Sequence, residues 1–188
     1  MTPPEDAGRI LLPLARAAIA TRLGKVADTP DMAGLEWLME LRATFVTLTE
    51  DGMLRGCIGS LQACRPLRQD VVVNARHAAF DDPRFTPVRV AELDRLHTEV
   101  SVLSTPEPLE VISERAVWAQ LRPGIDGVIL RAGGHRATYL PQVWEQLPRP
   151  QDFLASLKRK AGLPADYWSD RLQLDRYTVT AWSEESDD

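Results

Sequence analysis

The sequence predicts an α+β fold in which helices flank an antiparallel sheet. The first observation is a hairpin: residues 45–49 are rich in β-branched and aromatic side chains, Asp51-Gly52 is a strong turn signal, and residues 54–61 read as the returning strand. The second observation is that the expected strands and helices do not alternate strictly along the chain. Strict alternation is typical of parallel sheets, so this order favours antiparallel pairing.

The remaining elements are expected from apolar spacing and from residues that start or stop helices. Gly24 is a stop signal for the first helix, Pro66 is suited to open the second, and Ser113 is suited to cap the third. The expected helices are residues 8–23, 66–79, 113–121 and 152–161, and the other expected strands are residues 97–104, 127–131, 136–140 and 173–182.

Length and composition exclude several classes of protein. The 188 residues can form one domain, or a large and a small lobe, with a sizeable core, and a formal net charge of -5 argues against a general nucleic-acid binder. No run approaches the roughly 18 apolar residues of a membrane span, and the N-terminus does not read as a signal peptide. The two cysteines and three scattered histidines predict no disulfide scaffold, metal site or cofactor. We therefore expect a cytoplasmic protein with a frayed acidic tail at residues 183–188.

The stretch 54–59 is the sharpest candidate site. It is an expected strand that carries Cys57 between Gly56 and Gly59. Glycines inside a strand weaken it and often mark a place where backbone or ligand comes close. Arg55 lies two residues before the cysteine, so in a regular strand it shares the face of Cys57 and favours the thiolate. Cys57 is therefore a candidate nucleophile, and the arginine and both glycines are candidate ligand contacts.

The register of the hairpin decides between a structural and a chemical role for this cysteine. A two-residue turn pairs Cys57 with Val46, on an apolar face, and this favoured register makes Cys57 a small buried side chain. A bulged hairpin pairs Cys57 with Thr47 instead. A chemical role also requires a base, for which His77 on the following helix is the candidate.

Glu99 and Arg84 are two more charged residues that are candidate ligand contacts, each with a structural alternative. The guanidinium of Arg55 suits a carboxylate or phosphate, but an ion pair with Glu99 on a neighbouring strand is the favoured interpretation. Arg84 lies in a loop in which Asp82 either caps the turn or pairs with the arginine.

The second half of the chain offers two further candidates. Gln142 and Trp144 place an amide and an indole at the start of a short helical turn, where an anion can be held; the alternative is that Trp144 anchors the core. The basic run 158–160 lies in the last turn of a helix, and we expect it to be a surface run that complements the helix dipole.

Six segments, in order along most of the chain, resemble the AMMECR domain family, also called AmmeMemoRadiSam system protein A. They are Leu54–Leu61, Ala78–Phe85, Glu99–Ser104, Pro123–Leu130, Ala137–Trp144 and Lys160–Leu163. The resemblance implies a large and a small lobe with a cleft between them, lined in part by residues 54–59. It also implies association with a Memo-like protein and a radical S-adenosylmethionine protein, in a family without an established biochemical activity.

Three functions follow as hypotheses. The first is a binding or accessory module that acts with those two partner proteins, and it rests on the resemblance and on the lack of an evident acid/base set. The second is an enzyme whose cleft uses Cys57 and Arg55 on a small anionic or carbonyl substrate. The third is a nucleic-acid-associated regulator, against which the acidic charge balance argues.

Overall fold

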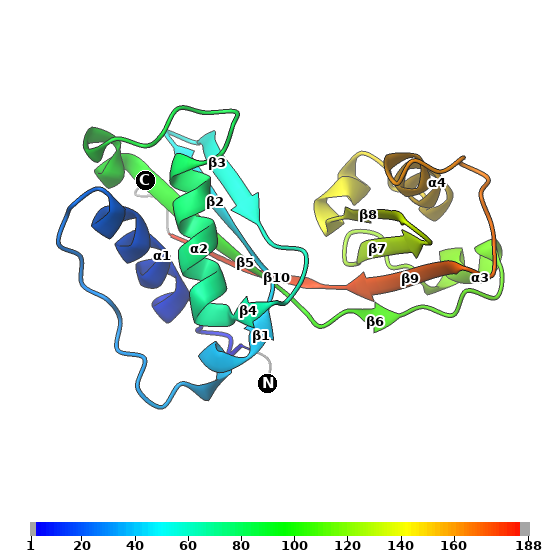
Figure 1. Cartoon of the computed structure of the whole chain (residues 1–188), viewed down its shortest axis with the longest axis horizontal. Coiled ribbons are helices and arrows are strands. Elements are labelled where there is room, and N and C mark those ends of the chain that lie inside the picture. The colour runs from blue at the N-terminus through cyan, green and yellow to red at the C-terminus, as the bar shows by residue number, and fades with distance from the viewer. Residues whose placement is uncertain (1–2, 185–188) are drawn as a thin grey trace. The chain divides into compact units, whose positions relative to one another are not determined.

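The structure, a computed structural model, describes residues 3–184. The described chain divides into two compact units: unit 1 comprises residues 3–103 and 180–184, and unit 2 comprises Ser104–Val179 (Figure 1). Both units combine helices with an antiparallel sheet, so the predicted α+β class is confirmed. The predicted cleft between two lobes stays a prediction.

Unit 1 is built on a four-stranded sheet with the strand order β10-β5-β2-β3. Strand β2 is central and pairs antiparallel with both β3 and β5. The two predicted helices of this unit are present within one or two residues of their expected ends. The elements are α1 (Gly8–Arg22), η1 (Glu36–Met39), β1 (Leu41–Arg42), β2 (Thr44–Glu50), β3 (Met53–Gly59), β4 (Arg65–Pro66), α2 (Leu67–Phe80), η2 (Val90–Arg95), β5 (Leu96–Leu103) and β10 (Val179–Ser183).

Helices α1 and α2 pack on one face of this sheet (Figure 1). Side chains alternate along a strand, so β2 sends Val46 and Leu48 to the helical face, where both are fully buried. Val71 and Ala75, one turn apart on α2, are buried in the same apolar cluster. The helical face is therefore the core of unit 1.

The opposite face of the sheet is polar. It carries Thr47 and Thr49 of β2, Cys57 of β3, and His97 and Glu99 of β5, all of them half-buried. The strand register places Thr47 between Cys57 and Glu99, and Thr49 beside His97. Since directly paired residues share a face, these five side chains form one surface, which we call the polar face.

Helix α2 approaches β3 very closely at Gly56. A Cβ atom at this position would lie 2.1 Å from the backbone carbonyl oxygen of Ala78. Backbone atoms of a packed helix cannot move aside as the end of a flexible side chain can. Gly56 therefore serves the packing of α2 on the sheet, and the neighbouring side chain of Cys57 points away from the helix.

A buried polar cluster joins β2, β4 and α2 at one end of the sheet. The fully buried carboxylate of Asp70 accepts hydrogen bonds from the backbone N–H (2.9 Å) and the hydroxyl (2.8 Å) of Thr44, and from the hydroxyl of Ser60 (2.9 Å). The guanidinium of Arg65 pairs with the same carboxylate at 2.6 Å, and the amide of Asn74 donates to it at 2.9 Å. A buried charge is tolerated when it is paired and hydrogen-bonded in this way.

Unit 2 has a four-stranded sheet of its own, with the order β6-β9-β7-β8 and antiparallel pairing throughout. As predicted, Ser113 caps α3, because its hydroxyl accepts a hydrogen bond from the backbone N–H of Ala116 at 3.2 Å. The elements are β6 (Glu107–Pro108), α3 (Glu114–Gln120), β7 (Gly127–Ala132), β8 (His135–Tyr139), η3 (Pro141–Glu145), α4 (Pro150–Lys160) and β9 (Leu172–Tyr177).

One residue of α4 corrects the predicted surface run. Lys158 is fully buried and pairs with Glu114 of α3. The reason is helical spacing: Lys158 follows Leu154 by four residues, so it lies on the same buried face of the helix. Its aliphatic stem packs inside while the ammonium group reaches a carboxylate.

The end of the chain differs from the expected long strand and tail. The predicted strand 173–182 is two strands, β9 and β10, which belong to different sheets. Ser183 ends β10, and Glu184 accepts hydrogen bonds from Arg16 (2.9 Å) and from the backbone N–H of Thr98 (2.8 Å), so these two residues belong to the folded unit rather than to a tail. The rest of the expected tail, residues 185–188, lies outside the described residues.

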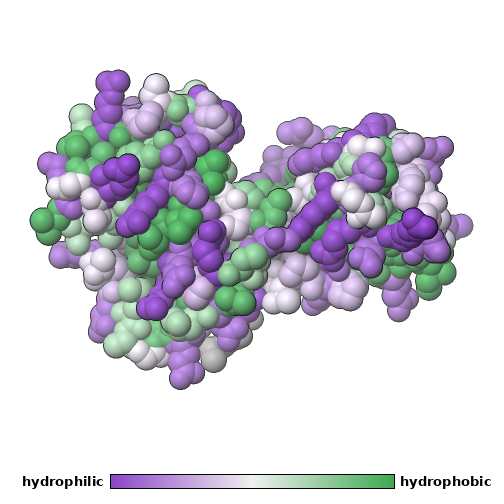
Figure 2. Space-filling view, viewed as in Figure 1, coloured by the Kyte–Doolittle hydropathy of each residue, from purple (hydrophilic) through white to green (hydrophobic). Residues whose placement is uncertain are grey.

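The surfaces of both units are mixed in character. Figure 2 shows hydrophilic and hydrophobic side chains intermingled over the viewed face of each. Across residues 3–184, no helix is both long and apolar enough to cross a membrane.

Candidate functional site

The β2–β3 hairpin contains a bulge that sets the position of Cys57. Thr49 pairs with Leu54 across the two-residue turn, as predicted, but the register then shifts and leaves Arg55 without a partner on β2. Beyond the shift, Cys57 pairs with Thr47. The favoured prediction, Cys57 opposite Val46, is therefore wrong, and the bulged alternative holds, because one extra residue on β3 moves every later side chain to the other face.

The bulge places the thiol on the polar face rather than in the core. Cys57 is half-buried, and its sulfur accepts a hydrogen bond from the Thr47 hydroxyl at 3.3 Å. Glu99 lies on the other side of Thr47, on β5. The three residues form a row across three strands, with the thiol at the edge of the sheet.

Two side chains from the loop after α2 occupy the free edge of β3 at Cys57. The carboxylate of Asp82 accepts a hydrogen bond from the Cys57 N–H at 2.9 Å, and the guanidinium of Arg84 donates to the Cys57 carbonyl oxygen at 3.2 Å. Asp82 also pairs with the Arg84 guanidinium at 2.7 Å and accepts a hydrogen bond from the Arg84 N–H at 3.1 Å, so both alternatives, the turn cap and the ion pair, are present. Asp82 and Arg84 thus occupy the N–H and carbonyl groups of Cys57, with which an additional strand would pair, so this edge of β3 is blocked at Cys57.

The Asp82–Arg84 pair is electrostatically strong. The Arg84 guanidinium holds the pKa of the Asp82 carboxyl well below its usual range, and the Cys57 and Arg84 N–H groups act in the same direction. The carboxylate in turn raises the pKa of Arg84. Arg84 is therefore the cation that contacts Cys57, a role that the sequence assigned to Arg55.

Arg55 pairs with a different acid from the one expected. Its Nε donates to the Glu92 carboxylate of η2 at 2.8 Å, and this contact lowers the pKa of Glu92. The predicted Arg55–Glu99 pair is wrong. As the extra residue of the bulge, Arg55 does not follow the alternation that the prediction assumed. Glu92 was missed because η2 carries no motif that links it to the hairpin.

The structure does not bring His77 to the thiol. His77 is an exposed residue of α2, the helix that packs on the Gly56 side of β3. Cys57, the next residue along the strand, points to the opposite side of the sheet. The candidate base and the candidate nucleophile are thus separated by the sheet itself.

The remaining candidates have structural roles or lie in unit 2. A Cβ atom at Gly59 would lie 2.3 Å from the ring of Phe45, so this glycine makes room for the ring. Trp144 is buried, stacks on Phe153 with ring centroids 3.8 Å apart, and donates to a backbone carbonyl of its own unit. Gln142 is exposed on the same 3₁₀ turn. Trp144 is therefore the core anchor that was the alternative interpretation.

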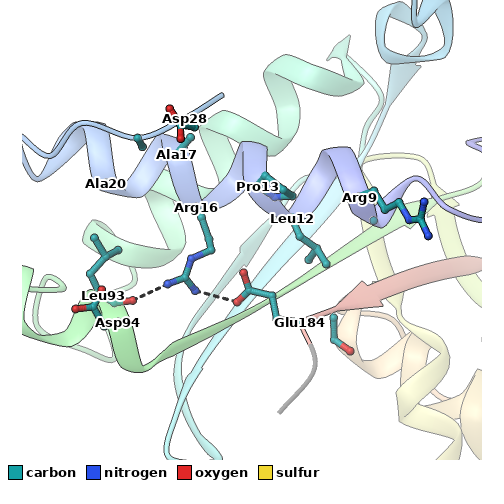
Figure 3. A pocket seen from close by; sticks show the side chains of 13 residues that line it. Arg9, Leu12, Pro13, Arg16, Ala17, Ala20, Asp28, Leu93, Asp94 and Glu184 are labelled. Atoms are coloured by element: carbon teal, nitrogen blue, oxygen red, sulfur yellow. Dashed lines mark hydrogen bonds and ion pairs between the residues drawn. The ribbon is translucent and has the colours of Figure 1, made fainter. Parts of the chain in front are cut away.

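A hollow of unit 1 lies beside α1 (Figure 3). Its volume is about 580 Å³, and its lining includes Arg16 together with Leu12 and Pro13 of the same helix. The Arg16 guanidinium donates to the carbonyl oxygens of Leu93 (2.9 Å) and Leu96 (2.7 Å) and pairs with Glu184. These bonds join α1 to two other segments, so Arg16 has a structural role in this hollow.

Comparison with known proteins agrees with the family signature. A family model described as AMMECR1 matches residues 12–182. A protein of Methanothermobacter thermautotrophicus is 40% identical over 176 residues, which cover 88% of this chain and 87% of the relative. A protein of Thermococcus gammatolerans is 39% identical, over 96% of this chain and 92% of its own length. The crystal structure of an uncharacterised protein, PH0010 from Pyrococcus horikoshii, has a TM-score of 0.79 and 35% identity, and the match covers 97% of this chain and 93% of that one. The chain therefore belongs to the AMMECR1 family.

Proposed function

We propose that the chain is a binding and accessory module that acts with a Memo-like protein and a radical S-adenosylmethionine protein. The observation that carries this proposal is the pairing of charges around Cys57: Arg55 is held by Glu92, and Arg84 by Asp82. Between residues 3 and 184, no histidine hydrogen-bonds the thiol. A cysteine nucleophile normally needs such a base, so the arrangement supports a stable recognition surface over catalysis.

The tip of the β2–β3 hairpin is the contact surface in this proposal. Met53 and Leu54 are consecutive at the start of β3, and their side chains are 73% and 43% exposed. Large apolar side chains that stand free of a folded unit are the groups that a protein partner buries as anchors. The Arg55–Glu92 pair next to them holds the base of the tip in place.

The double substitution Met53→Ser with Leu54→Ser is expected to raise the dissociation constant for the Memo-like or the radical S-adenosylmethionine protein at least about tenfold. A change of this size is typical of the loss of an interface hot spot. The measurement is the dissociation constant of each purified pair. Ile112→Ser is the matched control, since Ile112 is 77% exposed in unit 2. If the wild-type chain does not associate with either partner at micromolar concentration, the accessory role is contradicted. If Ile112→Ser weakens binding as much as the double substitution, the hairpin tip is not the contact surface.

The second candidate function is an enzyme that uses Cys57 and Arg55 on a small anionic or carbonyl substrate. It is favoured by one observation, that the thiol lies on the polar face, hydrogen-bonded by Thr47, rather than in the core.

Iodoacetamide labelling separates the two functions, because the chain offers an internal reference thiol. The variants Cys57→Ser and Cys64→Ser each leave one cysteine, and Cys64 is the exposed one. If the chain is a binding module, we expect the Cys57 thiol to be labelled more slowly than the Cys64 thiol at every pH from 6 to about 9, the range around the ordinary thiol pKa. Faster labelling of Cys57 at pH 6–7 would favour the enzyme.

A further inference from the structure

The polar face contains a hollow of about 400 Å³. Pockets that hold small molecules span roughly 300–1,000 Å³, so this one has a suitable size. It lies beside the candidate thiol but is not lined by it; Thr47 is the residue that borders both. Its lining includes Thr47, Thr49, His97, Glu99, Ser183 and Glu184.

Among the described residues, the hollow contains two carboxylates, and only one of them is paired with a cation. Glu184 is neutralised by Arg16, with which it pairs at 2.9 Å. In the part of the chain that the structure describes, Glu99 receives only a long hydrogen bond of 3.4 Å from Ser101. The three arginines that pair near the hairpin, Arg55, Arg84 and Arg95, are bound to other acids: Glu92, Asp82 and Glu50. A half-buried carboxylate without a cation is the one uncompensated charge of the hollow, and it favours a positively charged occupant.

The hydrogen-bonding groups around Glu99 point to the same chemistry. A carboxylate only accepts hydrogen bonds. The Thr47 hydroxyl already gives its hydrogen to Cys57, so its oxygen faces an occupant as an acceptor. An ammonium group supplies three donors and a charge, whereas a carboxylate or phosphate would be repelled by Glu99 and left short of donors.

The other end of the hollow is suited to a hydroxyl group. Thr49 and His97 are neighbours across β2 and β5, and no hydrogen bond or ion pair to either side chain occurs within the described residues. A hydroxyl can donate to one of these side chains and accept from the other. A metal ion is less suited, since residues 3–184 contain no group of three His, Cys, Asp or Glu side chains that could hold one.

We propose that this hollow binds a small hydroxylated primary amine, with its ammonium group on Glu99 and its hydroxyl group near Thr49 and His97. The sign of the charge is opposite to that of the anion expected from Arg55. The proposal goes beyond the accessory role and does not depend on the partner proteins, because the hollow lies within unit 1.

The test uses three probes that differ at one end only: 4-amino-1-butanol, 1,4-butanediol and 4-hydroxybutyrate. Each is titrated into the full chain and followed by the NMR shifts of the backbone amides of Glu99 and His97. We expect the amine to bind at least about tenfold more tightly than the diol, which corresponds to one partly desolvated ion pair. We expect the acid to bind no better than the diol.

Two variants with the same change in net charge complete the test. Glu99→Gln keeps the side-chain shape and is expected to reduce the affinity for 4-amino-1-butanol to that for the diol. Glu36→Gln, at an exposed position of η1, is expected to leave it unchanged. Equal binding of all three probes, absence of amine binding at 20 mM, or an unchanged affinity in Glu99→Gln would overturn the proposal. The comparison of the three probes on the wild-type chain remains a valid test even if Glu99→Gln folds poorly. None of these outcomes affects the separate test of binding to the partner proteins.

Discussion

Replacing Gly56 with alanine is expected to lower the free energy of unfolding by about 3 kcal/mol, the upper part of the range for overpacking. The added methyl group would lie 2.1 Å from the Ala78 carbonyl oxygen, so α2 must move away from β3. That movement opens the contact between the helix and the sheet, on which the apolar cluster of unit 1 depends. Urea unfolding followed by circular dichroism measures the loss as a lower midpoint.

The control for this variant is Gly134→Ala. Gly134 lies in the β7–β8 turn, and a Cβ atom there has no heavy atom within 4 Å and no positive φ to strain. Alanine at such a site is expected to be neutral or to stabilise by up to about 1 kcal/mol, since it restricts the unfolded chain. Similar urea midpoints for the two variants would show that the close approach at Gly56 does not cause the destabilisation of Gly56→Ala.

Replacing Asp70 with asparagine is expected to destabilise the chain by about 3 kcal/mol, as breaking a buried ion pair does. The substitution keeps the size of the side chain but removes the charge that Arg65 and the Thr44 donors share. It also turns one acceptor into a donor, so a buried N–H is left facing other donors. The expected result is a lower urea midpoint with an unchanged m-value.

Asp94→Asn is the matched control, because Asp94 is an exposed residue of η2. Its effect is expected to stay within about 0.5 kcal/mol. A loss for Asp70→Asn no larger than that of the control would mean that the buried cluster contributes specificity of structure rather than stability.

Features set by neighbouring residues were predictable from the sequence. The two-residue turn, the helix that Ser113 caps, and both helices of unit 1 follow from short-range rules and are present in the structure. Lys158 shows where such rules conflict, because its charge predicted exposure while its spacing from Leu154 predicted burial, and the spacing prevailed.

The contacts of the candidate site depend on chain segments that are distant in sequence. Arg55 and Glu92 are 37 residues apart, and the Cys57 amide and Asp82 are 25 apart. No periodicity links such positions, and the sequence suggested Glu99 as the partner of Arg55 because both lie on expected neighbouring strands. Gly56, beside the extra residue Arg55, is compatible with a bulge but equally with a close backbone approach, so the register could be decided only by the structure.

The strand order of unit 1 has a consequence for how the chain is made. Its sheet ends in β10, which follows the whole of unit 2 in the sequence, and Arg16 pairs with Glu184 across 168 residues. During synthesis, unit 2 can leave the ribosome and fold while unit 1 still lacks a strand. The sheet of unit 1 is therefore completed last, when β10 pairs with β5. A chain that terminates before β10 would leave the edge of β5 unpaired and able to pair with other chains.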